Sequence, residues 1–337
     1  MSNLNDLTAL ALPSGSRLIA DATESRLSLS LDGQPLIRLR LDREANGPIQ
    51  LDERFALPPG QALWAACYWL FARAPACQQL TWQLDQPPTE ALRSGLLINT
   101  EVAGEYRCER TLFWQLPQPW LGTSLTGSYP QQMVISHGKR HPLRPVKPRG
   151  EVYRRFDARL GAWISLRTLE IEEDLSRFNR WQNSPRVASF WQEEGSLEQH
   201  REYLSKLDAD PHTLTLIGCF DDQPFAYFEA YWAKEDRIAP FYDAGDYDRG
   251  IHMLVGEESH RGPHKVASWL SALVHYLFLD DPRTQRVVAE PRADNAKMIG
   301  HMHNQCFHCE KEFDFPHKRA ALMILGRERF FDRCRLA

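Results

Sequence analysis

The sequence has no long hydrophobic run, no basic excess and no paired cysteine pattern, and each absence excludes a class of protein. No apolar stretch reaches the roughly 18 residues that suggest a membrane-spanning helix. The formal net charge is −4, whereas nucleic-acid and membrane-surface binding favour a basic face. Seven scattered cysteines fit reduced thiols, and the N-terminus lacks the basic cluster of an export signal. We therefore expect a cytoplasmic enzyme or binding protein with no nucleic-acid or membrane partner.

The 337 residues are enough for two domains, and the clearest boundary between them is the segment SHGKRHPLRPVKPRG at 136–150. It contains three prolines, five lysines or arginines and no acidic residue. Such a composition predicts an extended, exposed linker between an N-terminal domain (1–135) and a C-terminal domain (151–337). The alternative is an arm that folds back over the second domain and binds phosphate.

The N-terminal part lacks a glycine-rich loop, a metal-ligand spacing and a nucleophile motif. Leucines and isoleucines alternate on both sides of Asp32-Gly33, which predicts a β-hairpin. Residues 58–73 read as a helix that opens with two prolines, and 80–84 and 111–116 read as strands. This half is predicted to be structural, with a possible role in forming a homodimer.

The C-terminal part has a more informative order of elements. A capping box at Ser196 and Gln199 predicts the start of one of its helices. The predicted order is β-α-α-β-β-β-α-β-α-β-β, with the segments at 163–169, 172–183, 197–207, 214–220, 225–232, 251–256, 265–279, 284–291, 294–304 and a closing hairpin within 311–325.

The turn between the predicted strand 251–256 and the next helix has the features of an anion site. A helix N-terminus offers unpaired N–H groups, which bind anions. Gly262 lets the main chain approach a ligand closely, and Arg261, His264 and Lys265 surround it. We expect a pyrophosphate such as that of coenzyme A, although a plain helix cap has the same pattern.

Several long strings of residues resemble GNAT siderophore acyltransferases, which act on N-hydroxylysine, N-hydroxyornithine or N-hydroxycadaverine. They lie within 148–331 and include RFNRWQNSPRVASFW, LIGCFDDQPFAYFEAYWAKEDRI, YDRGIHMLVGE and DDPRTQRVVAEPRADN. The resemblance implies an α/β (α+β) fold: a central, mostly antiparallel, twisted mixed sheet flanked by helices, preceded by a degenerate GNAT-like half. It also implies acetyl-CoA as the donor, no metal, a hydroxamate product and a place beside other siderophore-pathway enzymes.

The same resemblance implies two catalytic residues, His252 on the fourth core strand and Asp294 after the fifth. A hydroxylated amine is neutral near pH 7, so the enzyme needs to remove only one proton, and histidine titrates in the right range. We therefore expect the activity to rise through a pKa near that of ordinary histidine. Asp294 could orient His252, bind the hydroxyl group of the acceptor, or cap a helix.

Main-chain groups of the fourth strand are expected to bind the pantetheine and the thioester carbonyl. In this superfamily a bulge separates that strand from its neighbour, which makes Met253, Leu254 and Val255 the candidates. Asn295 matches the usual asparagine near the pantetheine arm.

The acceptor site is expected between two helices and the third strand. A flexible amino acid needs a carboxylate anchor, Arg186 or Arg249, and a partner for its α-amine, Glu229 or Asp248. Glu229 and Tyr231 share one face of their strand. The full set of expected acceptor residues is Trp181, Asn183, Arg186, Trp191, Glu229, Tyr231, Asp248 and Arg249.

Other functions remain open. His301, His303, Cys306, His308 and Cys309 crowd together, but a lone C-x-x-C lacks a second ligand pair, so no metal site is predicted. A GNAT-shaped binding module without catalysis is one alternative. A GNAT enzyme that uses another acyl-CoA, or an amine without a hydroxyl group, is another.

Overall fold

The computed structural model describes residues 9–42, 47–54, 59–122 and 129–336 and divides the chain into two compact units. The first unit is Met1–Pro119, with the short segments Arg155–Ala162 and Arg335–Ala337. The second is Trp120–Arg154 with Trp163–Cys334. No helix in the described ranges has the length and apolar character needed to cross a membrane.

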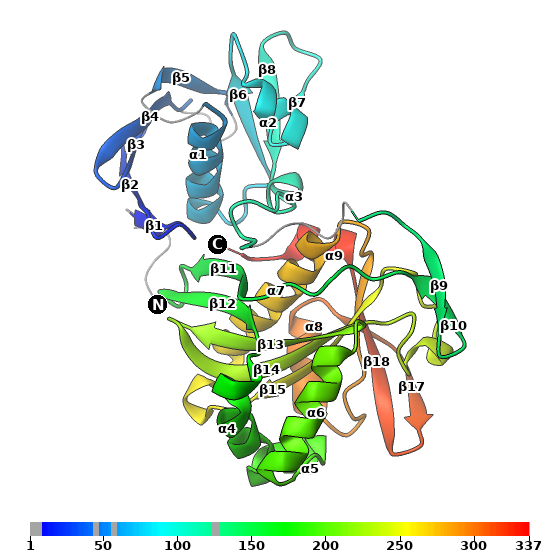
Figure 1. The fold of residues 1–337 in the computed structure, drawn as a ribbon. Helices are drawn as coiled ribbons and strands as arrows, with labels where there is room; N and C mark the ends of the chain where they lie inside the picture. Colours follow the sequence, from blue (N-terminus) through cyan, green and yellow to red (C-terminus); the bar gives the residue numbers. More distant parts are fainter. Residues whose placement is uncertain (1–8, 43–46, 55–58, 123–128, 337) are drawn as a thin grey trace. The chain divides into compact units, whose positions relative to one another are not determined.

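An eight-stranded sheet with the order β1-β2-β3-β4-β5-β6-β8-β7 forms the N-terminal half (Figure 1). Its elements are β1 (Ala9–Ala11), β2 (Arg17–Ala22), β3 (Arg26–Leu31), β4 (Gln34–Arg40), β5 (Ile49–Arg54), α1 (Pro59–Arg73), β6 (Gln79–Gln83), α2 (Thr89–Ser94), β7 (Ile98–Asn99), β8 (Glu105–Glu109) and α3 (Arg110–Phe113). The predicted hairpin is β3–β4, and Asp32 and Gly33 turn it with positive φ angles of 49° and 80°. Helix α1 links the parallel strands β5 and β6.

The predicted strand at 111–116 is wrong, because this segment begins inside helix α3. Phe113 and Trp114 are both fully buried, and their rings meet edge to face at 5.1 Å. Tyr68 of α1 contacts both rings. Adjacent residues of a strand point to opposite faces, so a helical turn is what brings both aromatic rings to the same helix.

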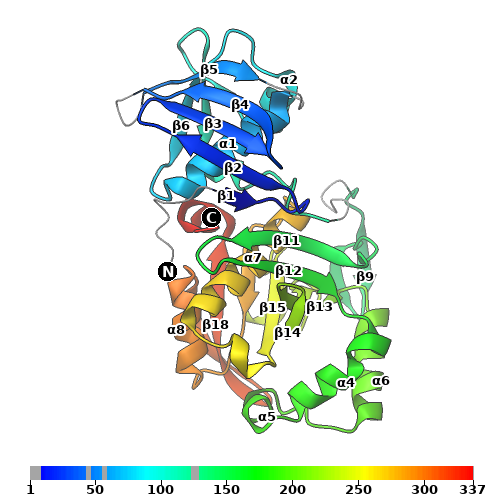
Figure 2. The ribbon, with the colours of Figure 1, turned by 90° about the vertical axis from the view of Figure 1, so that its left-hand side faces the viewer.

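A second eight-stranded sheet, β11-β12-β13-β14-β15-β16-β18-β17, forms the C-terminal half and repeats the strand order of the first (Figure 2). Its elements are β11 (Glu151–Asp157), β12 (Ala162–Thr168), α4 (Ile171–Gln182), α5 (Pro185–Trp191), α6 (Leu197–Ala209), β13 (Thr213–Phe220), β14 (Gln223–Trp232), β15 (Arg249–Val255), α7 (Pro263–Asp280), β16 (Arg286–Ala289), α8 (Ala296–Asn304), β17 (His308–Phe315), β18 (Lys318–Gly326) and α9 (Arg327–Arg333). The sequence predicted this order except for β11, α5 and α9. The capping box of Ser196 and Gln199 at α6 is confirmed.

The segment expected to be an exposed linker contains most of a two-stranded hairpin, β9 (Met133–Ser136) and β10 (Lys139–Pro142). The segment belongs to the second unit, and its basic side chains bind other parts of that unit. Lys139 donates to the carbonyls of Glu235 and Asp236, and Arg144 binds the Glu235 carboxylate at 2.5 Å. Lys147 donates to two further carbonyls. Because Lys139, Arg144 and Lys147 are held by these contacts, they are not available to bind phosphate, as the alternative of a phosphate-binding arm would require.

Helices cover both faces of the C-terminal sheet. Side chains of α4, α5 and α6 pack with Ile217, Tyr227 and Leu254 in one hydrophobic cluster. Trp269 of α7 stacks on Phe228 at 5.3 Å between ring centroids. Because Tyr227 and Phe228 are neighbours in β14, their side chains point to opposite faces, and α7 therefore covers the face opposite α4–α6.

Strands β15 and β16 diverge soon after they begin to pair. They are parallel and in register only at Arg249–Val287 and Gly250–Val288, whereas β15 stays paired with β14 along its whole length. No register shift interrupts the β14–β15 pairing in this described segment. The separation of the two strands is therefore present without the bulge that we expected in β15.

Candidate active site

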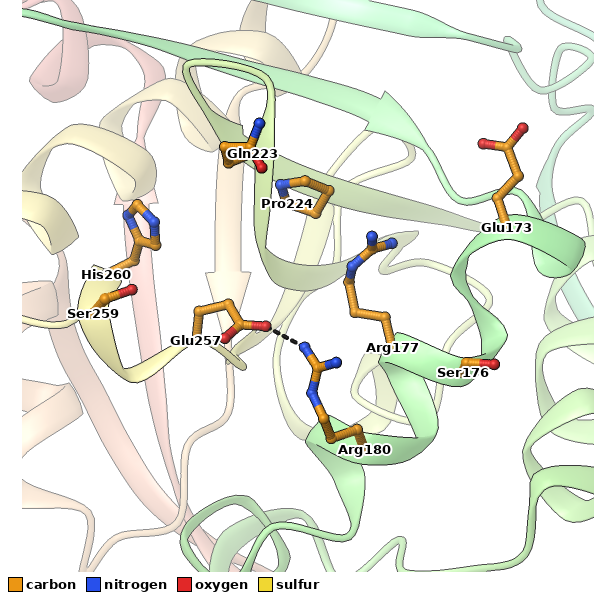
Figure 3. Close-up of a pocket in the computed structure, with 9 residues that line it drawn as sticks. All are labelled: Glu173, Ser176, Arg177, Arg180, Gln223, Pro224, Glu257, Ser259 and His260. Carbon is orange, nitrogen blue, oxygen red and sulfur yellow. Dashed lines mark hydrogen bonds and ion pairs between the residues drawn. The ribbon is translucent and has the colours of Figure 1, made fainter.

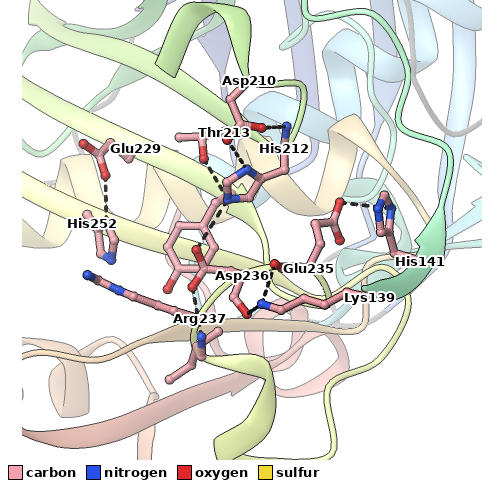
Figure 4. Close-up of polar contacts among 12 residues, drawn as sticks. Lys139, His141, Asp210, His212, Thr213, Glu229, Glu235, Asp236, Arg237 and His252 are labelled. Atoms are coloured by element: carbon pink, nitrogen blue, oxygen red, sulfur yellow. Dashed lines mark hydrogen bonds and ion pairs between the residues drawn. The ribbon is translucent and has the colours of Figure 1, made fainter. Parts of the chain in front are cut away.

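His252 lies in β15 beyond the last residue paired with β16, and two buried carboxylates hold its ring. Nδ1 lies 2.7 Å from Oε2 of Glu229, the residue directly opposite it in β14 (Figure 4). Nε2 lies 2.6 Å from Oε1 of Glu290, which follows the last residue of β16. The His252 side chain is 21% exposed, against 6% and 0% for the two glutamates, so it is the part of the group that a substrate can reach.

Three tyrosines hold the two carboxylates in place. The hydroxyls of Tyr203 in α6 and Tyr227 in β14 donate to Oε1 of Glu229 at 2.5 and 2.9 Å. The Tyr231 hydroxyl donates to Oε2 of Glu290 at 2.6 Å. Each carboxylate oxygen therefore has a hydrogen-bond partner, which offsets much of the cost of burying its charge.

The two carboxylates fix the charge of His252. Burial lowers the pKa of the imidazole, but Glu290 and Glu229 outweigh it and raise the pKa to about 10. Burial likewise raises the pKa of Glu290, and His252 outweighs this and lowers it to about 2. At neutral pH the group is a carboxylate, an imidazolium and a carboxylate. An ordinary histidine pKa, on which the expected rise of activity depended, does not fit this ring, because its raised pKa keeps it protonated at neutral pH.

The main chain of β15 offers hydrogen-bonding groups beside His252. The amide of Gly256 donates to the Phe225 carbonyl, and the amide of Ala233 donates to the Asp248 carbonyl. Antiparallel pairing alternates, so even-numbered residues of β15 bond to β14 and odd-numbered residues point away from it. The amides of Met253 and Val255 therefore face the separation from β16. Leu254, the third expected residue, is bonded to β14 and has a buried side chain.

The turn before α7 has the predicted form. Gly262 precedes the helix with a φ of 123°, and Pro263 occupies its first turn. No side chain of the described residues caps this end, so the amides of His264 and Lys265 are available. Arg261 and His264 are exposed, while Lys265 donates to the Ser259 carbonyl at 3.0 Å and braces the turn.

The structure does not bring Asp294 to His252. The Asp294 carboxylate is 63% exposed and binds Arg292 at 2.6 Å. Since Glu229 and Glu290 occupy both ring nitrogens, the orienting role that we allowed for Asp294 belongs to them. The capping role belongs to Asn295, whose side-chain oxygen accepts from the Met298 amide at 3.2 Å.

Three of the expected acceptor residues do lie at His252: Trp191, Tyr231 and Glu229. The ring of Trp191 meets the imidazole edge to face at 6.3 Å, and the Tyr231 ring lies at 4.8 Å. Glu229 and Tyr231 share a face as predicted. The expectation that Glu229 binds the acceptor amine is wrong, however, because two tyrosines and His252 surround its carboxylate.

Three charged residues expected at the acceptor site have structural roles instead. Arg249 is buried, binds Asp280 at 3.0 Å and lies over the Trp232 ring. Asp248 is buried and accepts from the Tyr242 hydroxyl, the Gly245 amide and Arg286. Arg186 donates to the carbonyls of Val255 and Gly256 at 2.7 and 3.1 Å. The charges of Arg249 and Asp248 are paired inside the fold, and the Arg186 guanidinium is held by main-chain carbonyls at the end of β15.

Trp181 and Asn183 also support the fold. Trp181 is buried and donates to Glu257 at 2.9 Å. A side chain at Gly256 would overlap its ring, so the two residues fix the end of β15 against α4. Asn183 exchanges two hydrogen bonds of 2.9 Å with the main chain of Gly195.

A groove of about 520 Å³ lies between α4 and the segment that connects β15 to α7 (Figure 3). Its two arginines are paired, Arg177 with Asp174 and Arg180 with Glu257. Neither His252 nor its two glutamates line this groove. Its lining is Glu173, Ser176, Arg177, Arg180, Gln223, Pro224, Glu257, Ser259 and His260.

The histidines and cysteines between 301 and 309 do not gather around one point. His303 Nδ1 is 3.1 Å from the Phe307 carbonyl, and His308 pairs with Glu310. Among the described residues, no three histidine, cysteine or acidic side chains form a group able to hold a metal ion.

Sequence reasoning missed Glu290, although a signal was present. The residue follows the buried apolar strand RVVA and precedes a proline. A carboxylate at that place cannot be hydrated by bulk water, so it needs a cationic or hydrogen-bonding partner inside the fold. His252 on the neighbouring strand was such a partner.

Comparison with known proteins agrees with this architecture. Residues 170–315 match the acetyltransferase (GNAT) domain family. A protein of Schizosaccharomyces pombe, whose name provisionally assigns it lysine N-acyltransferase activity, is 49% identical over 232 residues, or 68% of this chain and 69% of that protein. The N(6)-hydroxylysine O-acetyltransferase of Escherichia coli is 45% identical over 223 residues, or 66% of this chain and 70% of that protein.

A solved structure gives the same result for the fold. An uncharacterized protein from Bacillus halodurans superposes with a TM-score of 0.53 at 28% identity, covering 55% of this chain and 95% of that one. The family match, over residues 170–315, lies in the half that carries His252. The chain therefore belongs to the GNAT acyltransferase family.

Proposed function

We propose that the protein transfers the acetyl group of acetyl-CoA to the hydroxylated side-chain nitrogen of N6-hydroxylysine or a close analogue. The product is a hydroxamate for siderophore biosynthesis, made after another enzyme has hydroxylated the amine. The observation that carries the proposal is the group of Glu229, His252 and Glu290 beside the unpaired main chain of β15. The activity named for the Escherichia coli relative supports the choice of acceptor.

Acetyl-CoA has two points of attachment in this proposal. The amides of Met253 and Val255 would hold the pantetheine and the thioester oxygen, since they point away from β14. The exposed Arg261 and the first amides of α7 would hold the pyrophosphate. Arg186 lies close enough to Arg261 to add a second positive charge: burial and then Arg261 lower the pKa of Arg186, and Glu258 partly offsets them.

The reaction needs no net gain or loss of protons. The acceptor nitrogen attacks the thioester carbon, the C–N bond forms, the C–S bond breaks, and the proton of the nitrogen ends on the sulfur of coenzyme A. A carboxylate–imidazolium–carboxylate group has a net charge of −1. The imidazolium of His252 can donate a ring proton to the departing sulfur, and the neutral ring then takes the proton of the attacking nitrogen, so the group ends as it began.

The acetyl group could also go to the oxygen of the hydroxylamine, as the name of the Escherichia coli relative states. Nitrogen is the better nucleophile toward a thioester, and acylation of nitrogen gives a stable hydroxamate. We therefore propose N-acetylation. Asp294, exposed near the end of β16, remains a candidate for binding the acceptor hydroxyl group.

The identity of the product tests this proposal. Purified protein with acetyl-CoA and N6-hydroxylysine should give a product that binds ferric iron with the colour of a hydroxamate and shows the added acetyl mass. An O-acetyl ester has the same mass but gives no ferric colour. His252→Gln should reduce kcat by roughly 10²–10⁴-fold, the scale of a lost acid–base group. A colourless product, or none, contradicts N-acetylation.

We assign this chemistry to the C-terminal half and a structural role to residues 1–135, with homodimer formation as one possibility. The support is that the N-terminal half has the strand order of the second sheet, but its sequence from the end of β5 into α1, residues 55–60 (FALPPG), has no lysine, arginine or histidine. Because acetyl-CoA is present in the cytoplasm, we propose the cytoplasm as the compartment in which the enzyme acts.

A further inference from the structure

Arg237 stands out once the expected carboxylate anchors have been assigned to the fold. It lies in the loop between β14 and β15, and its side chain is 50% exposed. Its ion pair, to Oε1 of Glu290, is long at 3.8 Å, and no hydrogen bond to another described residue restrains it. Its guanidinium lies 5.4 Å from the centre of the Phe315 ring. Figure 4 shows the side chain extending toward His252.

The charges around Arg237 favour an anion. Burial, and then Arg237 and Lys318, lower the pKa of His317. Burial also lowers the pKa of Lys318, partly offset by Glu290, and Arg237 lowers it further. Lys318 itself is held by the Glu290 carbonyl at 2.7 Å. Arg237 and Lys318 are therefore two neighbouring cations beside Glu290, and Arg237 is the half-exposed one.

We propose that Arg237 binds the α-carboxylate of the acceptor, so that the enzyme selects an N-hydroxylated amino acid over the decarboxylated diamine. This inference rests on the proposed function, because it assumes an acceptor whose hydroxylated nitrogen is acetylated near His252. It names the substrate class within that function: N6-hydroxylysine is accepted, and N-hydroxycadaverine is disfavoured.

The distances suit this assignment. Glu290 Oε1 contacts both His252 Nε2, at 2.6 Å, and Arg237, at 3.8 Å. Six single bonds separate the side-chain nitrogen of hydroxylysine from its carboxyl carbon, which spans about 7 Å when extended. A lysine-length acceptor can therefore place its nitrogen near the imidazolium and its carboxylate on the guanidinium. Arginine presents paired N–H donors that match a carboxylate.

A nearby acid completes the recognition of an amino acid. Glu193 is exposed in the segment between α5 and α6. Burial and Glu229 raise its pKa, whereas His200 and Arg237 lower it, so Glu193 lies within electrostatic reach of both the active-site carboxylate and the arginine. The α-ammonium group of a zwitterionic acceptor would find its counter-charge there.

Arg237 could instead only neutralise the negative charge of the Glu229–His252–Glu290 group. The two roles make different predictions, because neutralisation acts on every acceptor whereas an anchor acts only on acceptors with a carboxylate. The comparison of N6-hydroxylysine with N-hydroxycadaverine isolates the carboxylate, since the rest of the chain is the same.

The test is the ratio of kcat/KM for these two acceptors in wild-type protein, Arg237→Ala and the control Arg319→Ala. Arg319 is an exposed arginine on β18 that pairs with Glu312 and Asp314. The wild type and the control should prefer N6-hydroxylysine. Arg237→Ala should lower kcat/KM for it by about 10- to 100-fold, mainly through KM, and leave N-hydroxycadaverine within about twofold.

Four outcomes would overturn the inference. A wild-type enzyme that shows no preference would mean that the site does not select the carboxylate. An Arg237→Ala variant whose kcat/KM falls equally for both acceptors would assign Arg237 to charge neutralisation. An Arg237→Ala variant that keeps its preference removes the residue from acceptor binding. A wild-type enzyme that acetylates neither hydroxylamine overturns the proposed function itself, and the role of Arg237 with it.

Discussion

His252 has a hydrogen bond from each ring nitrogen to a carboxylate, and this sets both its charge and the pH range in which it acts. The raised pKa of the ring stabilises the folded protein fully below the unfolded value, near 6.5, and this contribution is lost as the pH rises toward about 10. The lowered pKa of Glu290 contributes above its unfolded value and is lost as the pH falls toward about 2. Between about pH 2 and about pH 10, Glu290 stays ionised and His252 stays protonated, so the hydrogen bond between them keeps both its charges.

The protonation of His252 can be followed by nitrogen NMR of the histidine rings, with the signal assigned by its absence in His252→Gln. We expect both ring nitrogens to stay protonated through pH 8 and to titrate near 10. Glu290→Gln removes the largest contribution that raises the pKa of His252. The His252 signal of this variant should therefore titrate at lower pH. Glu312→Gln, an exposed partner of Arg319, should leave it unchanged. A wild-type titration near 6.5 would show that the ring is not held as a cation.

The sequence placed some residues at the site correctly and misassigned others, and the difference has a physical reason. His252, Trp191 and Tyr231 were found because strand periodicity or family strings fix their positions. Arg186, Arg249 and Asp248 were misassigned because a charged residue looks the same in sequence whether it faces a ligand or a buried partner. That difference depends on contacts between segments far apart in the chain, such as Arg249 with Asp280.

At the scale of elements, the turn from β15 into α7 joins the thioester end of the site to the pyrophosphate end. The strand supplies main-chain donors, and the helix begins seven residues after Gly256. The positive φ of Gly262 is unfavourable for other residues, and a side chain there would also lie 3.0 Å from the His264 ring.

Arg261→Ala should weaken coenzyme A binding by about 10- to 100-fold, since it removes a charge-assisted contact to phosphate. The melting temperature should change little, because Arg261 is exposed. Calorimetry gives both the affinity and the stoichiometry, which should be one coenzyme A per chain. Arg201→Ala, an exposed arginine of α6 paired with Glu172, serves as the control. Unchanged affinity would remove this turn from the site, and a stoichiometry of two would give the N-terminal half a site of its own.

Elements with strong local signals were predicted well, and those set by tertiary packing were not. The capping box of α6 and the Asp32-Gly33 hairpin depend on neighbouring residues alone. Helix α3 was missed because the burial of Phe113 and Trp114 against α1 overrides the strand propensity of its apolar residues. The segment 136–150 looked like a linker because its partners, such as Glu235, are distant in sequence.

On the scale of the whole chain, the two halves repeat one topology, which confirms the GNAT-like first half that the family resemblance implied. Both sheets have eight strands in the same order, and in both a helix connects the parallel fifth and sixth strands. They differ between the second and third strands. Only a three-residue turn joins β2 to β3, whereas α4, α5 and α6 join β12 to β13 and contribute Tyr203 and Trp191 to the site.

The chain as a whole is therefore an acyltransferase with an active site suited to a neutral amine. At pH 7.4 only about one lysine side chain in a thousand is unprotonated. An imidazolium with a pKa of about 10 cannot remove the proton from the others. A hydroxylated amine avoids this barrier because its nitrogen is already neutral.

The most direct test of the account is the ratio of kcat/KM for N6-hydroxylysine to that for lysine, measured with acetyl-CoA at pH 7.4. The account predicts a preference for the hydroxylated amine of at least about 100-fold, because so little lysine carries a free amine. It also predicts that raising the pH to 9 narrows the ratio as lysine loses its proton. Comparable values for the two acceptors at pH 7.4 would contradict the account, since the site would then contain a base strong enough to deprotonate an ammonium group.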